Sequence, residues 1–519
     1  MNSKKYKKYK KSYEKSYKKN KPRNVTINNK INDIILKTRK KYNKKGGLGD
    51  EYNENITDNI AAGVGETNDI VDIDLDVDKR MLDDKMKNIL NDKIKNILNE
   101  NIINKNKNLS NLLQIICKNS TNCLSFSYYN SVIKHLFDNF NLKYINNKKI
   151  IKIGEVSANG YILLLPFEKL SYTVYAALKF ALKAHSDNLY YEYIVGKYFI
   201  NKQINKLPCF LETYHLYLSP NINSTKYYDI INNSRREITF SLKDELIPVI
   251  TDEHNFDYGL SCDKPLNLCL LMQYFNNFIS FKNYFQEIFN EDDLKDRLSV
   301  STLFYQVYFP LTVLSNNYTH YDLHAKNAFL YKPFDGKQCI KMIYHTNNNI
   351  ITFLTEYIVK IIDYGRNHFN NGILNTDIFM NNICNTDKCK PTCGSKYGYV
   401  MIQGHNTPHI RESKIFPRKP NISHDLRLAH ILRDILIDKI HICDNIVYDN
   451  NFGTKELLSD DIYNGIVKNI FDMRKALENN LLNYDDNYFK DIFNEYQIVA
   501  EMHIYEDGRD YEFNILPTT

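Results

Sequence analysis

The chain has 519 residues, 43% apolar and 13% aromatic, which is enough to bury the cores of two or three domain-sized units and excludes a protein disordered throughout. No apolar run approaches the roughly 18 to 20 residues that span a membrane, and the lysine-rich N-terminus lacks the apolar stretch of a secretory signal. The ten cysteines are mostly scattered singly, so we expect a soluble, unsecreted protein with reduced thiols.

A basic arm opens the chain. Residues 1–50 hold 18 lysines and arginines against 3 acidic residues, although the whole chain has a formal net charge of only +7. Clustered cations with interleaved tyrosines can bind nucleic acid, because they displace counterions from phosphates and stack on bases. A solvated, disordered tail explains the same composition. We expect residues 1–80 to be a disordered arm and linker, with nucleic acid as a partner that the arm could recruit.

The next segments differ in periodicity. Residues 81–148 are expected to form a helical lead-in, in which Lys85–Asp92 is repeated almost verbatim as Lys93–Glu100. Short β-type runs such as Tyr161–Phe167 and Tyr172–Ala184 follow in residues 149–275, and residues 276–519 are expected to be mainly helical. This order predicts an α+β protein with a small β-rich unit before a larger helical one.

Two motifs carry chemistry. The stretch His320 to Asn327 fits the pattern H-x-D-L-x-x-x-N and follows the apolar segment Leu303–Leu314, which predicts a supporting helix. Farther along, the strand-like run Tyr357–Ile362 leads directly into Asp363-Tyr364-Gly365. Phosphoryl transfer needs a carboxylate that orients the attacking hydroxyl, and oxygen ligands that hold Mg²⁺ against the phosphates. The two motifs contain these groups in the required order.

These motifs resemble those of the protein-kinase superfamily over roughly residues 150–440. The resemblance implies a two-lobed fold that binds ATP and Mg²⁺, with Mn²⁺ as a substitute. It also implies that Asp322 is the catalytic carboxylate and that Asn327 and Asp363 are metal ligands. A degenerate glycine-rich loop with Gly154 and Gly160 would cover the phosphates.

The same resemblance suggests the remaining parts of a nucleotide site. Lys179 and Lys183 both fit the nucleotide-pairing lysine, and we choose Lys179 because it leaves room for a connection before a helix spanning Asn188–Ile200. Glu192 on that helix would be the partner of the lysine. Met272, Gln273 and Tyr274 resemble the hinge that receives adenine, and Asp425 resembles the buried aspartate that braces the catalytic loop.

The chain also departs from the family. Tyr321 replaces the arginine of H-R-D, so we expect activity without activation-loop phosphorylation, and His324 replaces a lysine, as in haspin-like kinases. The 35 residues between Asn327 and Asp363 imply an inserted hairpin around Asn347–Asn349. No convincing A-P-E motif follows. The cysteines that could bind zinc, at low expectation, are Cys384, Cys389 and Cys393.

The leading hypothesis is therefore a serine/threonine protein kinase acting on a protein substrate. A small-molecule kinase, favoured by His324, and a pseudokinase scaffold with an interaction arm are the alternatives. The composition, rich in Asn, Lys, Ile and Tyr and lacking Trp, resembles that of proteins from large cytoplasmic DNA viruses. That resemblance implies a location in the host cytoplasm or the virion, away from membranes.

Overall fold

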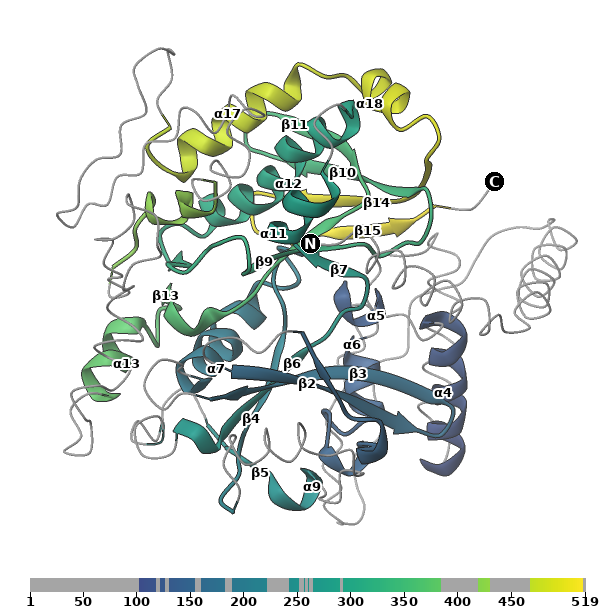
Figure 1. Cartoon of the computed structure of the whole chain (residues 1–519), viewed down its shortest axis with the longest axis vertical. Coiled ribbons are helices and arrows are strands. Elements are labelled where there is room, and N and C mark those ends of the chain that lie inside the picture. Colours follow the sequence, from purple (N-terminus) through teal and green to yellow (C-terminus); the bar gives the residue numbers. More distant parts are fainter. Residues whose placement is uncertain are drawn as a thin grey trace, which may run out of the picture. The chain divides into compact units, whose positions relative to one another are not determined.

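The computed structural model describes residues 102–117, 122–126, 130–154, 160–182, 189–221, 242–251, 256, 260, 265–289, 293–383, 419–429 and 467–516. All of them belong to one unit of the chain, residues 73–519. The predicted arm and linker (residues 1–80) and the near-repeat at residues 85–100 lie outside the described residues. The described part combines helices with several sheets and is of the α+β class (Figure 1).

A six-stranded antiparallel sheet is formed by the first half of the described chain, with the order β1-β2-β3-β6-β4-β5. Its two long inner strands, β2 and β3, confirm the strands predicted from Tyr161 and from Tyr172. Both strands are rich in aliphatic and aromatic side chains, and most of their residues are buried. The strands are β1 (Ile151–Ile153), β2 (Gly160–Lys169), β3 (Tyr172–Ala181), β4 (Thr213–Leu218), β5 (Ile247–Pro248) and β6 (Leu268–Gln273).

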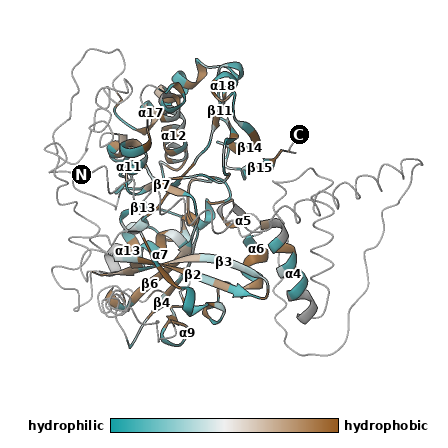
Figure 2. Ribbon diagram, turned by 45° about the vertical axis from the view of Figure 1, so that its right-hand side comes forward, coloured by the Kyte–Doolittle hydropathy of each residue, from teal (hydrophilic) through white to brown (hydrophobic). Residues whose placement is uncertain are grey.

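Helices border this sheet. The segment before it forms α4 (Ile102–Cys117), α5 (Asn122–Ser125) and α6 (Asn130–Leu136). α4 shows both brown and teal residues in Figure 2, and its buried leucines (Leu109, Leu112 and Leu113) alternate with exposed polar residues. Such a stripe buries one face of a helix against its neighbours. After the sheet's third strand comes α7 (Leu189–Tyr198), which packs on β4 and β6; a short helix, α9 (Leu242–Glu245), precedes β5.

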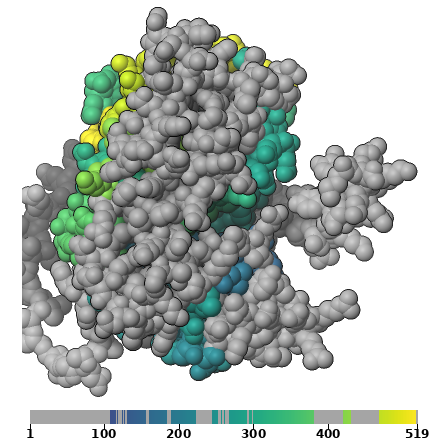
Figure 3. Space-filling view, turned by 60° about the vertical axis from the view of Figure 1, so that its left-hand side comes forward, coloured from purple at the N-terminus to yellow at the C-terminus, as the bar shows by residue number. Residues whose placement is uncertain are grey.

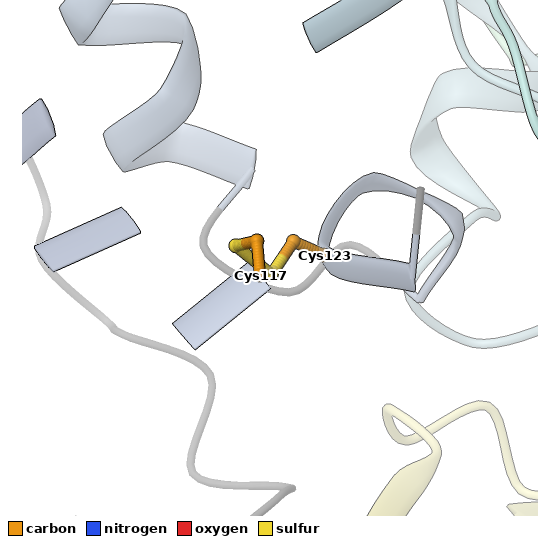
Figure 4. Close-up of a disulfide and its surroundings, with 2 residues drawn as sticks. All are labelled: Cys117 and Cys123. Atoms are coloured by element: carbon orange, nitrogen blue, oxygen red, sulfur yellow. A yellow bond between two sulfur atoms is a disulfide. The ribbon is translucent and has the colours of Figure 1, made fainter. Parts of the chain in front are cut away.

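Two cysteines in the segment before the sheet contradict the expectation of reduced thiols. Cys117 ends α4 and forms a disulfide with Cys123 in α5 (Figure 4). The Cα atoms of the two cysteines lie 5.8 Å apart, within the range that a disulfide requires. Sequence spacing could not reveal this pair, because pairing depends on the path of the chain. Cys209, Cys269 and Cys339 are free and buried.

α5, which the disulfide joins to α4, contacts the end of β6. The side-chain amide of Gln273 donates a hydrogen bond to the carbonyl oxygen of Leu124. The ring of Phe126 packs on Phe513 near the C-terminus, with 4.3 Å between ring centroids. The lead-in segment therefore contacts both the six-stranded sheet and elements that come much later in the chain.

The second half of the described chain is built around one buried helix, α12 (Leu294–Val313). All its residues from Val300 to Thr312 are buried, so this part of the helix lacks the exposed polar stripe of a surface helix. It covers and extends the helix predicted at Leu303–Leu314, which is confirmed. The other helices of this half are α11 (Phe281–Asn283), the π-helix η5 (Tyr284–Ile288), α13 (Thr376–Ile383), α17 (Ile470–Leu482) and α18 (Asp486–Ile492).

This half is less helical than its sequence predicts, since it contains three further sheets. Their orders are β11-β10-β14-β15, β12-β9-β7 and β13-β8. The strands are β7 (Phe278–Ser280), β8 (Tyr318–Thr319), β9 (Ala328–Tyr331), β10 (Gln338–His345), β11 (Ile350–Thr355), β12 (Ile358–Ile361), β13 (His368–Phe369), β14 (Gln497–Tyr505) and β15 (Glu512–Ile515).

The hairpin predicted around Asn347–Asn349 is confirmed, because β10 and β11 pair antiparallel on either side of it. β10 also pairs in parallel with β14, about 160 residues later in the chain. The inserted hairpin is thus completed into a four-stranded sheet by the C-terminal strands. In Figure 3, yellow atoms of the C-terminal segment reach the surface at the top, and blue and teal atoms of the six-stranded sheet region reach it at the bottom.

One lysine is buried in the core of the second half. Lys360 in β12 is 1% exposed, and its Nζ donates a hydrogen bond of 2.5 Å to the carbonyl oxygen of Pro208. Burial lowers the pKa of Lys360 from 10.5 to about 8. The ring of Phe126 lies 5.9 Å from this ammonium group.

Replacing Lys360 by methionine is expected to raise the free energy of unfolding at pH 7 by about 2 kcal/mol, because a buried charge is replaced by an apolar chain of similar length. The unfolded state binds the proton more tightly than the folded state does. Wild-type stability should therefore rise relative to the variant between pH 8 and 10.5, and the gap should close. Urea unfolding at pH 7 and pH 10 measures both effects, with Lys341→Met on the neighbouring sheet as the control. A variant less stable than wild type at pH 7 would contradict the prediction.

Candidate active site

The loop from His320 to Asn327 lies between β8 and β9, and the carboxylate of Asp425 fixes its backbone. Asp425 is 2% exposed, and its two oxygens accept hydrogen bonds from the backbone N–H groups of His320 (2.8 Å) and Tyr321 (2.9 Å). Burial raises the pKa of Asp425. The His320 ring is also buried, and its Nε2 lies 2.9 Å from the carbonyl oxygen of Ile362. The loop is therefore tied both to a distant segment and to the end of β12.

Asp322 lies in this loop between two guanidinium groups. Arg427 Nη1 is 2.9 Å from Asp322 Oδ1, and Arg366 Nη1 is 3.3 Å from Asp322 Oδ2. His324 Nε2 is farther away, at 4.0 Å. Burial alone would raise the pKa of Asp322, but the charges of Arg366 and Arg427 hold it well below its usual range. The carboxylate is thus ionised and its direction is set.

Asn327 is 6% exposed and is oriented by the same loop. Its side-chain Nδ2 donates a hydrogen bond of 2.9 Å to the carbonyl oxygen of Asp322. Its own carbonyl oxygen accepts from the N–H of Ile362, immediately before Asp363, at 3.0 Å. With Nδ2 engaged, Oδ1 is the atom through which Asn327 can ligate a cation.

Two backbone positions in these motifs are unusual. Tyr321 and Asp363 are not glycines, yet their φ angles are +61° and +70°, in the left-handed region. This conformation costs free energy and persists only where surrounding contacts enforce it, which is common at functional sites. Here those contacts are the Asp425 carboxylate for Tyr321 and the ion pair of Asp363 described next.

Lys179, Glu192 and Asp363 meet in one cluster. Lys179 Nζ on β3 lies 2.7 Å from Glu192 Oε2 and 3.1 Å from Asp363 Oδ1. Glu192 on α7 is 1% exposed, whereas the side chain of Asp363 is 36% exposed. Burial raises the pKa of Asp363, but the charge and the hydrogen bond of Lys179, together with the charge of Arg366, lower it overall. Three residues singled out from the sequence are therefore brought together, and Lys183 lies outside the described residues.

α7 is fixed to the segment that follows Asp363. The Tyr191 hydroxyl donates to the carbonyl oxygen of Asn367 at 2.6 Å and lies 2.8 Å from the Thr376 hydroxyl. The Tyr364 hydroxyl accepts from the N–H of Leu211 at 2.9 Å. These buried contacts keep Glu192 facing Lys179.

The two predicted phosphate-loop glycines have different surroundings. Gly154 follows β1 with φ +68°, and it is exposed. Gly160 begins β2, where an added Cβ would lie 2.2 Å from the Phe180 carbonyl oxygen on β3. Gly160 is therefore required by the close approach of two strands. Residues 155–159 between the glycines lie outside the described residues.

The predicted hinge residues end β6. Met272 is half-buried and pairs with Ala177 on β3, two residues before Lys179. The side chains of Met272 and Lys179 are therefore on the same face of the sheet. The side chain of Gln273 is buried and bonded to the backbone of Glu212 and Leu124, and its N–H donates to the Glu212 carbonyl oxygen at 2.8 Å. Its side chain and its N–H are therefore already engaged within the protein. Tyr274 is half-buried, and its ring lies 6.5 Å from that of Tyr175.

Sequence reasoning missed both arginines beside Asp322. Arg366 follows Asp363 by three residues, and Arg427 follows Asp425 by two. Their closeness to recognised motifs was a signal, because a site that lacks the usual arginine and lysine needs another source of positive charge. The Tyr321 hydroxyl donates to the Lys419 carbonyl oxygen at 2.6 Å, and its ring packs on His424.

Metal-binding clusters and membrane-spanning helices can be assessed for the part of the chain that the structure describes. They contain no group of three or more His, Cys, Asp or Glu side chains that could hold a metal ion. A site built from two carboxylates or a carboxylate and an amide would not form such a group. Cys384, Cys389 and Cys393, the proposed zinc ligands, lie outside the described residues. No helix in the described part is both long and apolar enough to span a bilayer.

No family model matches the chain, and no curated protein matches it at a significant level.

Proposed function

We propose that this chain is an ATP- and Mg²⁺-dependent phosphotransferase with a two-lobed, protein-kinase-like fold, and that it phosphorylates serine or threonine side chains of a protein substrate. One observation carries the proposal. The buried Asp322–Asn327 loop and the Lys179–Glu192–Asp363 cluster occur in one unit, linked by the hydrogen bonds that join the loop to Ile362. Structural ion pairs alone would not require a loop aspartate, an amide and a left-handed Asp363 in this order.

The residues present fit magnesium and a nucleotide. Asp363 offers a partly exposed carboxylate and Asn327 an amide oxygen, which are the hard ligands that Mg²⁺ combines with phosphate oxygens and water. The bound metal would supply charge neutralisation at the phosphates. Lys179 would orient the phosphates while Glu192 holds its ammonium group, and Asp322 would orient the acceptor hydroxyl.

A small-molecule acceptor is the second candidate. His324 stands beside Asp322, where protein kinases usually carry a lysine. The side chain beside Asp322 therefore differs in shape and charge from that of most protein kinases. This difference would change which acceptor hydroxyl fits, and it leaves the phosphoryl-transfer chemistry unchanged.

The test is transfer from γ-labelled ATP in the presence of Mg²⁺, offered to generic protein substrates and, separately, to a panel of small alcohols and sugars. Label on protein supports the protein kinase, and label on a small molecule supports the alternative. Failure of the wild-type protein to bind Mg·ATP would refute both.

The metal role of Asp363 has its own expected result. Asp363→Ala should abolish the Mg²⁺ dependence of ATP binding, because the variant lacks the one carboxylate placed to ligate the metal in this site. Calorimetric titration of ATP with and without Mg²⁺ measures it, and Asp335→Ala, an exposed aspartate away from the site, is the control. A variant whose affinity still responds to Mg²⁺ as wild type does would exclude Asp363 as a ligand.

A further inference from the structure

Both oxygens of the Asp322 carboxylate are occupied in this structure. Oδ1 accepts a hydrogen bond from Arg427 at 2.9 Å, and Oδ2 lies 3.3 Å from Arg366. An acceptor hydroxyl must hydrogen-bond to one of these oxygens before it can attack. Each oxygen can accept a second hydrogen bond, but a hydroxyl that approaches either one competes with a guanidinium for it. Release of one arginine would leave an oxygen fully available to the acceptor.

The two arginines differ in their freedom to move. Arg427 is 0% exposed, and it follows the turn η7 (His424–Leu426), which is held through the bonds of Asp425 to the loop. Removing its guanidinium from Asp322 would leave a fully buried cation without its counter-charge, which is costly. Arg366 ends the short turn η6 (Tyr364–Arg366), and its side chain is 20% exposed. Arg366 is therefore the partner that can leave.

The terminal phosphate of ATP is the group that Arg366 could bind in place of Asp322. Asp363, three residues before Arg366, is the proposed ligand of the metal that would accompany ATP, so the terminal phosphate would lie close to Arg366. A guanidinium binds phosphate oxygens through two parallel hydrogen bonds, and a doubly charged phosphate group competes well against one carboxylate.

We propose that Arg366 exchanges between Asp322 in the empty enzyme and the terminal phosphate of ATP in the loaded one. This inference rests on the proposed function. The exchange makes Arg366 a catalytic residue, because it touches the phosphoryl group as it is transferred. It also makes the site sequential, since Asp322 Oδ2 becomes fully available to the acceptor only after the terminal phosphate is bound.

Phosphoryl transfer from ATP to the acceptor hydroxyl would need only ATP, the acceptor and Asp322 as proton acceptor. The acceptor oxygen forms a bond to phosphorus, and the bond from phosphorus to the bridging oxygen breaks with its electron pair remaining on ADP. The hydroxyl proton goes to Asp322 Oδ2 and then to solvent. Arg366 stays on the oxygens of the transferred group, where negative charge accumulates.

The decisive measurement compares two nucleotides. In Arg366→Met, the affinity for Mg·ATP should fall roughly tenfold or more while that for Mg·ADP changes less than about twofold, because only ATP carries the phosphate that Arg366 binds. The value of kcat should fall about 10²- to 10³-fold, as for loss of one donor to a reacting oxyanion. Arg366→Lys should recover part of kcat, and millimolar guanidinium chloride should recover part of the activity of Arg366→Met.

Controls separate the outcomes. Arg509→Met removes an exposed arginine paired with Asp507, far from the catalytic loop in the chain, and should leave both affinities unchanged. Equal losses of ATP and ADP affinity in Arg366→Met, or no loss of either, would overturn the exchange even if the wild type transfers phosphate. Absence of ATP binding by the wild type would instead refute the proposed function and the inference together.

Discussion

Asp322→Asn is expected to lower the rate of phosphoryl transfer by about 10²- to 10⁴-fold, the usual contribution of a positioned general base. The asparagine side chain has the same shape but cannot accept the hydroxyl proton. Binding of Mg·ATP should be retained or strengthened, because Asp322 is not itself assigned to the nucleotide and its neutral replacement would hold Arg366 less tightly. Transfer from γ-labelled ATP and nucleotide titration on the same preparation measure the two effects.

The stability of this variant needs a separate control, because Arg427 is fully buried against Asp322. Removing the negative charge should reduce the free energy of unfolding by about 3 kcal/mol. Adding Arg427→Met should restore part of that stability without restoring transfer, since the uncompensated cation is gone while the base is still missing. Asp335→Asn serves as the matched surface substitution. Wild-type rates in Asp322→Asn would remove Asp322 from the mechanism.

Lys179→Met is expected to abolish measurable transfer and to weaken Mg·ATP binding, because the ammonium group that joins Glu192 to Asp363 is lost. It should also destabilise the fold by about 3–5 kcal/mol, since Glu192, 1% exposed, would lose the cation that lies 2.7 Å from it.

The double variant Lys179→Met/Glu192→Gln distinguishes structure from catalysis. Neutralising the buried glutamate should recover much of the stability, and activity should stay lost because no cation is available to the phosphates. Urea unfolding with parallel transfer assays completes the double-mutant cycle. Recovery of activity along with stability would mean that Lys179 serves the fold alone.

Much of the site could be predicted from the sequence, because each group lies at a fixed distance from a local structural signal. Asp363 follows a run of buried strand residues, and Lys179 lies on an alternating strand. A helix could be placed on the segment that carries Glu192, and α7 lies there. Local pattern determines the type of element and which residues share a face, and the order of the motifs then suggested which elements should meet.

Other features depended on contacts between distant segments. The pairing of β10 with β14, the Cys117–Cys123 disulfide and the position of Lys360 follow from where the chain returns after long excursions, which local periodicity does not encode. For the same reason the second half was expected to be mainly helical: short strands with few residues give weak signals until a partner strand is known.

The amino-acid sequence by itself determined the α+β class, the main strands of the first sheet and the choice of candidate site residues, because these depend on residue type and local spacing. Only the tertiary structure decided which charges surround Asp322. Arg366 and Arg427 come from segments that are separate in the chain, and the burial of one and partial exposure of the other arise from packing. That difference in burial, which no motif expresses, is the physical basis for assigning one arginine to the fold and the other to the reaction.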